Sequence, residues 1–225
     1  MRKNFIRLII GALVVCSANV CHAQSEAELR DSLHKAADCL AFHPDSVELR
    51  VEKARWNMLL QQWAYAKEEY DFVLDRNPNH FEARKFRAYA NEQMGRYNFA
   101  RLDYEWALRL NPGDLNAMMG MAVLLQKMKH YTEALDMVNR LVNAHPESPE
   151  AYAARANIEK ERKMYDLAVY DFSRAIELDS TNKDYLLNRL DLLVKLNRRV
   201  EADRDIKRLT QLGMPRPALK KYMMK

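Results

Sequence analysis

Apolar positions recur along most of the chain at a fixed interval of 34 residues. Five successive repeats share the pattern: 47–80, 81–114, 115–148, 149–182 and 183–216. Position 8 of the repeats is small or apolar, position 20 is always alanine, and position 24 is aromatic or β-branched. Small residues let two helices approach closely, and larger side chains fill the space beside them. The pattern predicts a pair of packed helices in each repeat.

Prolines punctuate these repeats. Pro44, Pro78, Pro112 and Pro146 are each 34 residues apart, and Ser180 stands at the next interval. Proline has no backbone N–H and does not continue a helix, so it marks the turn that follows one. A period of 34 is typical of helical hairpin arrays. We therefore expect an all-α chain of five stacked hairpins.

The repeats resemble the tetratricopeptide repeat family, whose pattern has small residues at positions 8 and 20, aromatics at 17 and 24, and proline at 32. Residues 81–114 match best, through Ala88, Gly95, Tyr97, Ala100, Tyr104, Ala107 and Pro112. The first repeat has Gln61 in place of the glycine at position 15, and the last has Arg199 and Met214 at the aromatic and proline positions. The resemblance covers residues 47–216 and implies a right-handed α-solenoid with a curved inner surface that binds other proteins.

The segments that flank the repeats are expected to act as caps. Residues 24–46 read as the second helix of an incomplete repeat, from Glu26 to Phe42. Residues 217–225 form a short basic tail that starts at Pro217, two residues after Pro215. End repeats of a solenoid need such segments to cover an apolar face.

Residues 1–23 differ from the rest and read as a signal peptide. A basic start precedes a short apolar run, and Cys21-His22-Ala23 resembles a cleavage site. The apolar run is shorter than the roughly 20 residues of a membrane-spanning helix. We expect export to a bacterial periplasm or envelope, or secretion. Retention as an anchor and lipidation at Cys16 or Cys21 remain alternatives, and an uncleaved segment would be the only contact with a membrane.

The mature chain carries little net charge. The whole chain has 36 basic and 31 acidic residues, and residues 1–23 hold three of the basic ones, which leaves a charge of +2. Such a balance gives no case for binding nucleic acid. Cys39 is the one cysteine that remains, so we expect no internal disulfide, and we expect its side chain to be small apolar filling.

An internal alignment of the repeats predicts one specific contact. Positions 7 and 23 pair a base with an acid in four repeats, and both are methionine in the third: Lys53/Glu69, Arg87/Asp103, Met121/Met137, Arg155/Asp171 and Arg189/Asp205. Pairing position 23 with position 7 of the following repeat would instead join charges to methionines. We therefore expect contact within each repeat, with a structural role.

No constellation of residues indicates catalysis. Five histidines remain after residue 23, and no two stand at metal-ligand spacing. There is no nucleophile motif and no glycine-rich phosphate loop. We expect no enzymatic activity, no cofactor and no metal.

The resemblance places first-helix positions 5 and 9 on the concave face. The candidate groove residues are Val51, Arg55, Lys85, Tyr89, Met119, Val123 and Asn157. An aromatic ring and a methionine beside a cation suit an apolar side chain next to a carboxylate. Met118 and Met121 fall instead on positions expected to be core.

These patterns predict a non-enzymatic scaffold that binds a peptide or a partner helix on its concave face. The alternative is a structural subunit of a cell-envelope assembly that packs through its convex face and edges. Exposed apolar residues on the second helices would favour the alternative, and Phe72-Val73 and Val169-Tyr170 are the stretches where we expect them.

Overall fold

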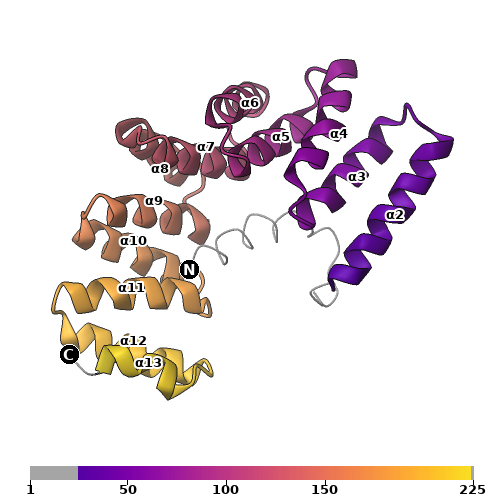
Figure 1. Cartoon of the computed structure of the whole chain (residues 1–225). Helices are drawn as coiled ribbons and strands as arrows, with labels where there is room; N and C mark the ends of the chain where they lie inside the picture. The colour runs from indigo at the N-terminus through magenta and orange to yellow at the C-terminus, as the bar shows by residue number, and fades with distance from the viewer. Residues whose placement is uncertain (1–24, 224–225) are drawn as a thin grey trace. The chain divides into compact units, whose positions relative to one another are not determined.

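The structure, a computed structural model, describes residues 25–223, and every regular element among them is an α-helix (Figure 1). The predicted all-α solenoid of helical hairpins is confirmed. The expected signal segment, residues 1–23, lies outside the described residues. Within residues 25–223, no helix is long and apolar enough to cross a membrane.

The chain divides into two compact units between Gly120 and Met121, a point inside one continuous helix. The described helices of the first unit are α2 (Glu26–Phe42), α3 (Val47–Leu59), α4 (Trp63–Arg76), α5 (Phe81–Gln93), α6 (Tyr97–Leu110) and the start of α7 (Leu115–Lys127). Here α3 packs on both α2 and α4, and α5 packs on both α4 and α6. Consecutive helices therefore form the layers of this unit.

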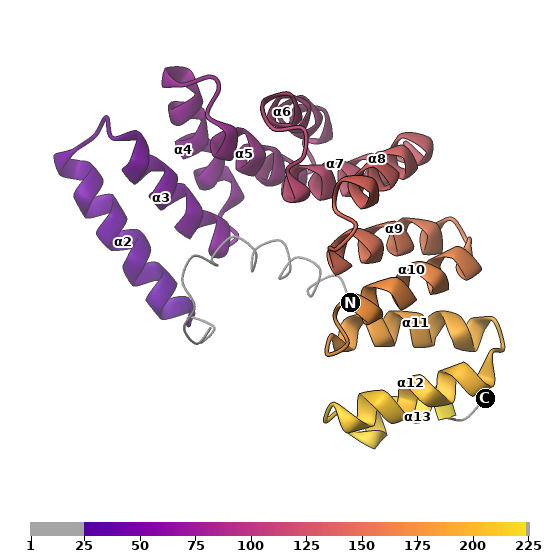
Figure 2. The same ribbon diagram turned by 180° about the vertical axis from the view of Figure 1, so that it is seen from behind.

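The second unit continues the same plan. Its helices are the end of α7, α8 (Tyr131–Ala144), α9 (Pro149–Glu161), α10 (Tyr165–Leu178), α11 (Lys183–Lys195), α12 (Arg199–Gln211) and α13 (Arg216–Met223). Helices α9 to α12 lie side by side in sequence order in both views (Figure 1 and Figure 2). The short helix α13 packs back on α11, where Tyr222 Oη donates to Asp191 Oδ1 at 2.6 Å.

The residue that precedes each repeat caps the first helix of that repeat. A side-chain acceptor at this position takes a hydrogen bond from a backbone N–H in the first turn, as at Ser46, His80, Asp114, Ser148 and Asn182. Such a bond satisfies one of the donors that an α-helix leaves unpaired at its start. Each first helix thus begins at a fixed register.

The turn inside each hairpin uses a left-handed residue at position 15. Gly95 has a φ of 74°, and non-glycine residues take the same conformation with φ from 58° to 64°: Gln61, Lys129, Lys163 and Asn197. Only glycine adopts this region without a steric penalty. Gln61 nevertheless adopts the same left-handed conformation as Gly95, so the first repeat keeps this turn without a glycine.

The core follows the predicted positions. The residues at positions 8 and 20 are buried in all five repeats, and so are Met118 and Met121. Buried aromatic residues such as Tyr70, Tyr104 and Phe172 occupy position 24. The prediction for Cys39 was wrong, because this cysteine is exposed on α2. Within residues 25–223, the main helix contact of α2 is with α3.

Candidate functional site: a basic pocket and an exposed apolar face on α6

The predicted contact between positions 7 and 23 is present in all four charged repeats. Arg87, Arg155 and Arg189 each donate two hydrogen bonds to the aspartate at position 23, over 2.5 to 2.9 Å. In the first repeat Lys53 Nζ lies 2.6 Å from Glu69 Oε1. All four carboxylates belong to buried residues. A bidentate arginine–carboxylate pair of this kind fixes geometry as well as charge, so each pair locks the two helices of its own hairpin.

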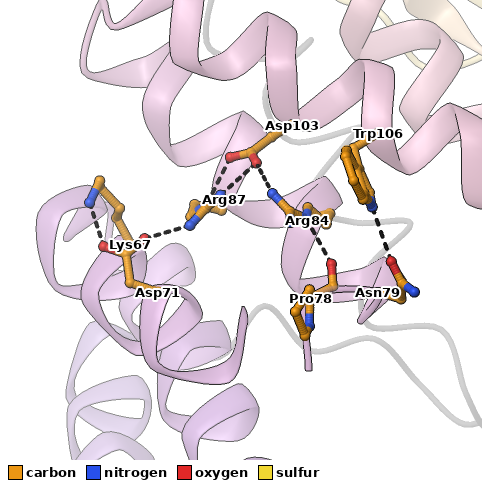
Figure 3. A network of polar contacts seen from close by, with 8 residues as sticks. All are labelled: Lys67, Asp71, Pro78, Asn79, Arg84, Arg87, Asp103 and Trp106. Carbon is orange, nitrogen blue, oxygen red and sulfur yellow. Dashed lines mark hydrogen bonds and ion pairs between the residues drawn. The ribbon is translucent and has the colours of Figure 1, made fainter. Parts of the chain in front are cut away.

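Each of these arginines also reaches back to the preceding repeat. Arg87 Nη1 donates to Asp71 Oδ1 at 2.8 Å, and the equivalent nitrogen of Arg155 donates to Asn139 at 3.2 Å. Arg189 Nη1 donates to Ser173 Oγ at 2.9 Å. Figure 3 shows Arg87 between Asp71 and Asp103. The third partner always comes from position 25 of the preceding repeat, so one side chain links three helices. Sequence reasoning missed this second link.

The candidate groove residues of the first unit are mostly covered. Tyr89 and Met119 are each 4% exposed, and Lys85 is 7% exposed. The ring of Tyr89 meets Trp63 edge to face at 5.7 Å. Lys85 Nζ lies 3.5 Å from Asp114 Oδ2 and above the Phe81 ring. Val51 is also buried. These four side chains pack within the repeats.

Arg55 is the exposed member of the set in this unit, and its Nη2 donates to Glu82 Oε2 at 2.8 Å. Of the two groove candidates in the second unit, Val123 is half-buried and Asn157 donates to the backbone carbonyl of Ala153 at 2.8 Å. Arg55, Lys85 and Asn157 thus each have a polar partner within their own unit, whereas the buried hydroxyl of Tyr89 has no hydrogen-bond partner among the described residues.

One buried carboxylate stands out in the second unit. Burial raises the pKa of Glu159 to about 7, helped by the nearby negative charge of Asp171. Its Oε2 has no hydrogen-bond partner within residues 25–223. No group of three or more potential metal ligands lies together in that part of the chain.

The outer side of α6 carries an exposed apolar row, which we call the α6 face: Phe99, Leu102, Trp106 and Leu110. Phe99 and Leu102 are 64% and 63% exposed. The spacing of three and four residues places all four on one side of the helix. Rows of this length are uncommon on helices that face only water. The α6 face is therefore the strongest candidate for an interaction surface in the first unit.

A pocket of about 410 Å³ adjoins the α6 face and extends toward α4 and α5. Four cations and two carboxylates line it, and Phe99 and Leu102 form part of its edge: Lys67, Arg84, Arg87, Arg96, Asp71 and Asp103. Lys67, Arg84 and Arg87 share the two carboxylates among them. We call this the basic pocket, because its lining carries more positive than negative charge.

Two arginines border the ends of the α6 face, and one of them, Arg96, also lines the basic pocket. Arg96 stands just before α6, and Arg109 lies in its last turn. Neither forms an ion pair within residues 25–223, and Arg109 lies 5.7 Å from the centre of the Trp106 ring. Arg84 approaches the same ring at 4.9 Å, and Trp106 Nε1 donates to Asn79 (Figure 3). Cations held against an aromatic ring are attracted by its quadrupole.

The sequence predicted exposed apolar residues at two other stretches, Phe72-Val73 and Val169-Tyr170. Tyr170 is exposed and Leu167 accompanies it on α10, whereas Val169 and Val73 are buried and Phe72 is half-buried beneath Arg50 and Arg76. The α6 face was missed. Phe99, Leu102 and Trp106 stand at positions 19, 22 and 26 of the second repeat, and these positions carry charged residues in the third repeat: Glu133, Asp136 and Arg140. That contrast between repeats could have indicated the face.

Comparison with known proteins supports the fold. The tetratricopeptide repeat model matches residues 92–158. No curated protein sequence matches the chain. A tetratricopeptide repeat protein from Parabacteroides merdae superposes with a TM-score of 0.69 at 21% identity, over 88% of this chain and 77% of that one. Pseudomonas aeruginosa PilF gives 0.68 at 16% identity, over 94% and 91%.

A third similar structure is YrrB, described as a tetratricopeptide repeat protein with an unusual peptide-binding site. Its TM-score is 0.57 at 17% identity, over 80% of this chain and 93% of that one. Identities this low establish the shared fold alone. The family model places tetratricopeptide repeats at residues 92–158, and the 34-residue period and the hairpins continue the same pattern over residues 47–216.

Proposed function

We propose that this chain is a non-enzymatic scaffold that holds a partner protein through the outer faces of its second helices. The observation that carries the proposal is the exposed α6 face, with Phe99 and Leu102 more than 60% exposed. Apolar rows at protein interfaces supply the anchors that carry most of the binding energy. This arrangement favours the alternative, packing through outer surfaces, over the predicted peptide in the concave groove.

Two observations support an outer surface. The apolar groove candidates Tyr89 and Met119 are nearly fully covered, so a partner has little of their surface to bury. Tyr170 and Leu167 repeat the exposed apolar pattern on α10. Tetratricopeptide repeats generally serve as interaction scaffolds.

The site of action is proposed to be the bacterial envelope or periplasm. This part of the proposal depends on the sequence of residues 1–23, where a basic start precedes an apolar run and a possible cleavage site. Separating the membrane and periplasmic fractions of the source organism and detecting the chain in each would test it. A full-length chain in the cytoplasm would contradict it.

A peptide in the concave groove is the second candidate. The likeness to YrrB, described as having a peptide-binding site, favours it, and Arg55 offers an exposed charge there. In this mode a partner carboxylate would compete with Glu82 for Arg55.

Site-specific photo-crosslinking separates the two modes. Residues 24–225 would carry a photoreactive amino acid in place of Leu102 in one sample and in place of Arg55 in another, and both would be irradiated in envelope extract of the source organism. Both positions are exposed, so neither replacement disturbs the core. We expect a partner protein joined through position 102. Crosslinks through position 55 alone would favour the groove, and no protein crosslink at either position would contradict the scaffold proposal.

A further inference from the structure

The α6 face has a length and a charge pattern that restrict its occupant. Its four apolar residues extend from Phe99 to Leu110, about 16 Å along the helix. Side chains spaced three and four residues apart form a ridge that fits the groove on another helix. An occupant that covers the whole face is therefore a helix of about three turns or more.

The charges beside the face are positive at both of its ends. Arg96 precedes Phe99, Arg109 precedes Leu110, and neither has an ion-pair partner in residues 25–223. Along the side toward α4, the basic pocket adds four cations, one of them Arg96, against two carboxylates. Three of its cations already share both carboxylates, so the pocket has no acid left for Arg96.

A second copy of this chain is a poor occupant on these grounds. In a two-fold dimer the same surface meets itself. Two antiparallel α6 helices would place Arg96 of each copy near Arg109 of the other, with like charges facing across the interface. Like charges that face each other across an interface oppose association. The face therefore calls for a partner of the opposite charge.

We propose that the α6 face binds an amphipathic helix of another protein, whose apolar row is flanked by carboxylates. The apolar row covers Phe99, Leu102, Trp106 and Leu110, and the carboxylates pair with Arg96 and Arg109. This inference rests on the proposed scaffold function and adds the chemistry of its partner. Charge at the two ends sets the position of the bound helix along α6, and apolar burial supplies the affinity.

The second unit offers a matched comparison surface. Leu167 and Tyr170 stand on α10 at the same repeat positions as Phe99 and Leu102 on α6. The positions of Lys67, Arg84 and Arg96 are occupied two repeats later by Leu135, Tyr152 and Met164. The α10 surface is thus exposed and apolar at these two positions and lacks equivalents of three of the four pocket cations, although Arg155 stands at the position of Arg87 and Arg174 at that of Trp106. It therefore tests, within one chain, the contribution of the three missing cations.

The probes are two synthetic helical peptides of about 18 residues, five turns. Both have leucine at every third or fourth position, and the polar positions are glutamate in one and lysine in the other. Fluorescence anisotropy measures their binding to residues 24–225, which include every described residue. We expect the glutamate peptide to bind at least about tenfold more tightly than the lysine peptide, with the difference reduced at high salt.

Two double variants locate the site. The double variant Phe99→Ser, Leu102→Ser should bind the glutamate peptide at least about tenfold more weakly than wild type. The double variant Leu167→Ser, Tyr170→Ser should change the affinity for this peptide less than about twofold. Arg96→Glu with Arg109→Glu should reverse the preference, so that the lysine peptide binds more tightly. All of these residues are exposed, and circular dichroism would check that the helices persist.

Several outcomes would overturn the proposal. Equal binding of the two peptides, binding of neither, or equal loss from the α10 variant would each do so. Self-association that disappears with Phe99→Ser and Leu102→Ser would make a second copy the occupant. If neither peptide binds but a photoreactive residue at position 102 still crosslinks to a protein, the proposed acidic amphipathic helix is wrong and the scaffold function stands.

Discussion

The guanidinium of Arg87 donates two hydrogen bonds to the carboxylate of Asp103, at 2.8 and 2.7 Å. A third donor of the same side chain reaches Asp71 in the preceding repeat. The third repeat does without such a pair, because Met121 and Met137 occupy the equivalent positions and are buried. The chain therefore contains both an ionic and an apolar solution to the same packing problem.

Replacing Arg87 alone should cost more stability than replacing the pair. Arg87→Ala leaves Asp103 buried with only Arg84, 3.1 Å away, as a cation partner, so we expect a loss of about 2–3 kcal/mol in the free energy of unfolding. Arg87→Met with Asp103→Met imitates the third repeat and should cost less. Urea unfolding of both variants measures the difference. If the double variant has a lower free energy of unfolding than Arg87→Ala, a methionine pair does not replace the ion pair in this repeat.

Gly120 should not accept a methyl group. A Cβ built on Gly120 would lie 2.5 Å from the ring of Tyr104, which is fully buried. Gly120→Ala should therefore destabilise by about 1–3 kcal/mol despite the better helix propensity of alanine.

Tyr104→Val provides the control for this clash. One repeat further on, Val138 and Ala154 occupy the positions of Tyr104 and Gly120. In a Tyr104→Val background, Gly120→Ala should become neutral or stabilising, as a double-mutant cycle by thermal unfolding would show. Equal costs in both backgrounds would place the strain elsewhere.

Stability should fall with rising pH through the buried Glu159. Burial raises its folded-state pKa from 4.5 to about 7. Between these values the folded chain binds more protons than the unfolded chain, so the free energy of unfolding decreases as pH rises from about 4.5 to 7. The decrease from this one group is up to about 3 kcal/mol.

Glu159→Gln should remove that part of the pH dependence and make the chain more stable than wild type at pH 8. Glu161→Gln is the matched control, because Glu161 is exposed two residues away. Urea unfolding at a series of pH values provides the comparison. An unchanged profile in Glu159→Gln would show that another group causes the decrease.

The left-handed turn residue offers a way to stabilise the chain. Lys163 has a φ of 63°, where a side chain costs about 1 kcal/mol relative to glycine. Lys163→Gly should raise the free energy of unfolding by about 0.5–1 kcal/mol, reduced somewhat by the greater freedom of glycine in the unfolded chain.

Gly95→Lys is the reciprocal change. Nothing lies within 4 Å of a Cβ at Gly95, so any loss reflects its φ of 74° and not a clash. We expect destabilisation of similar size, measured by thermal unfolding. A neutral result would mean that this turn relaxes out of the left-handed region.

The period, the hairpins, the buried small positions and the pairing of Arg87 with Asp103 were all predictable from the amino-acid sequence. These features depend on spacing within one repeat, and five copies serve as an internal alignment. The tertiary structure decided what neighbouring repeats cover. Tyr89 lies against Trp63 and Arg87 reaches Asp71, each across a junction between repeats, and Lys85 approaches Asp114, which caps the first helix of the next repeat. The exposed α6 face has the same origin, because exposure depends on which side of a helix its neighbours leave uncovered.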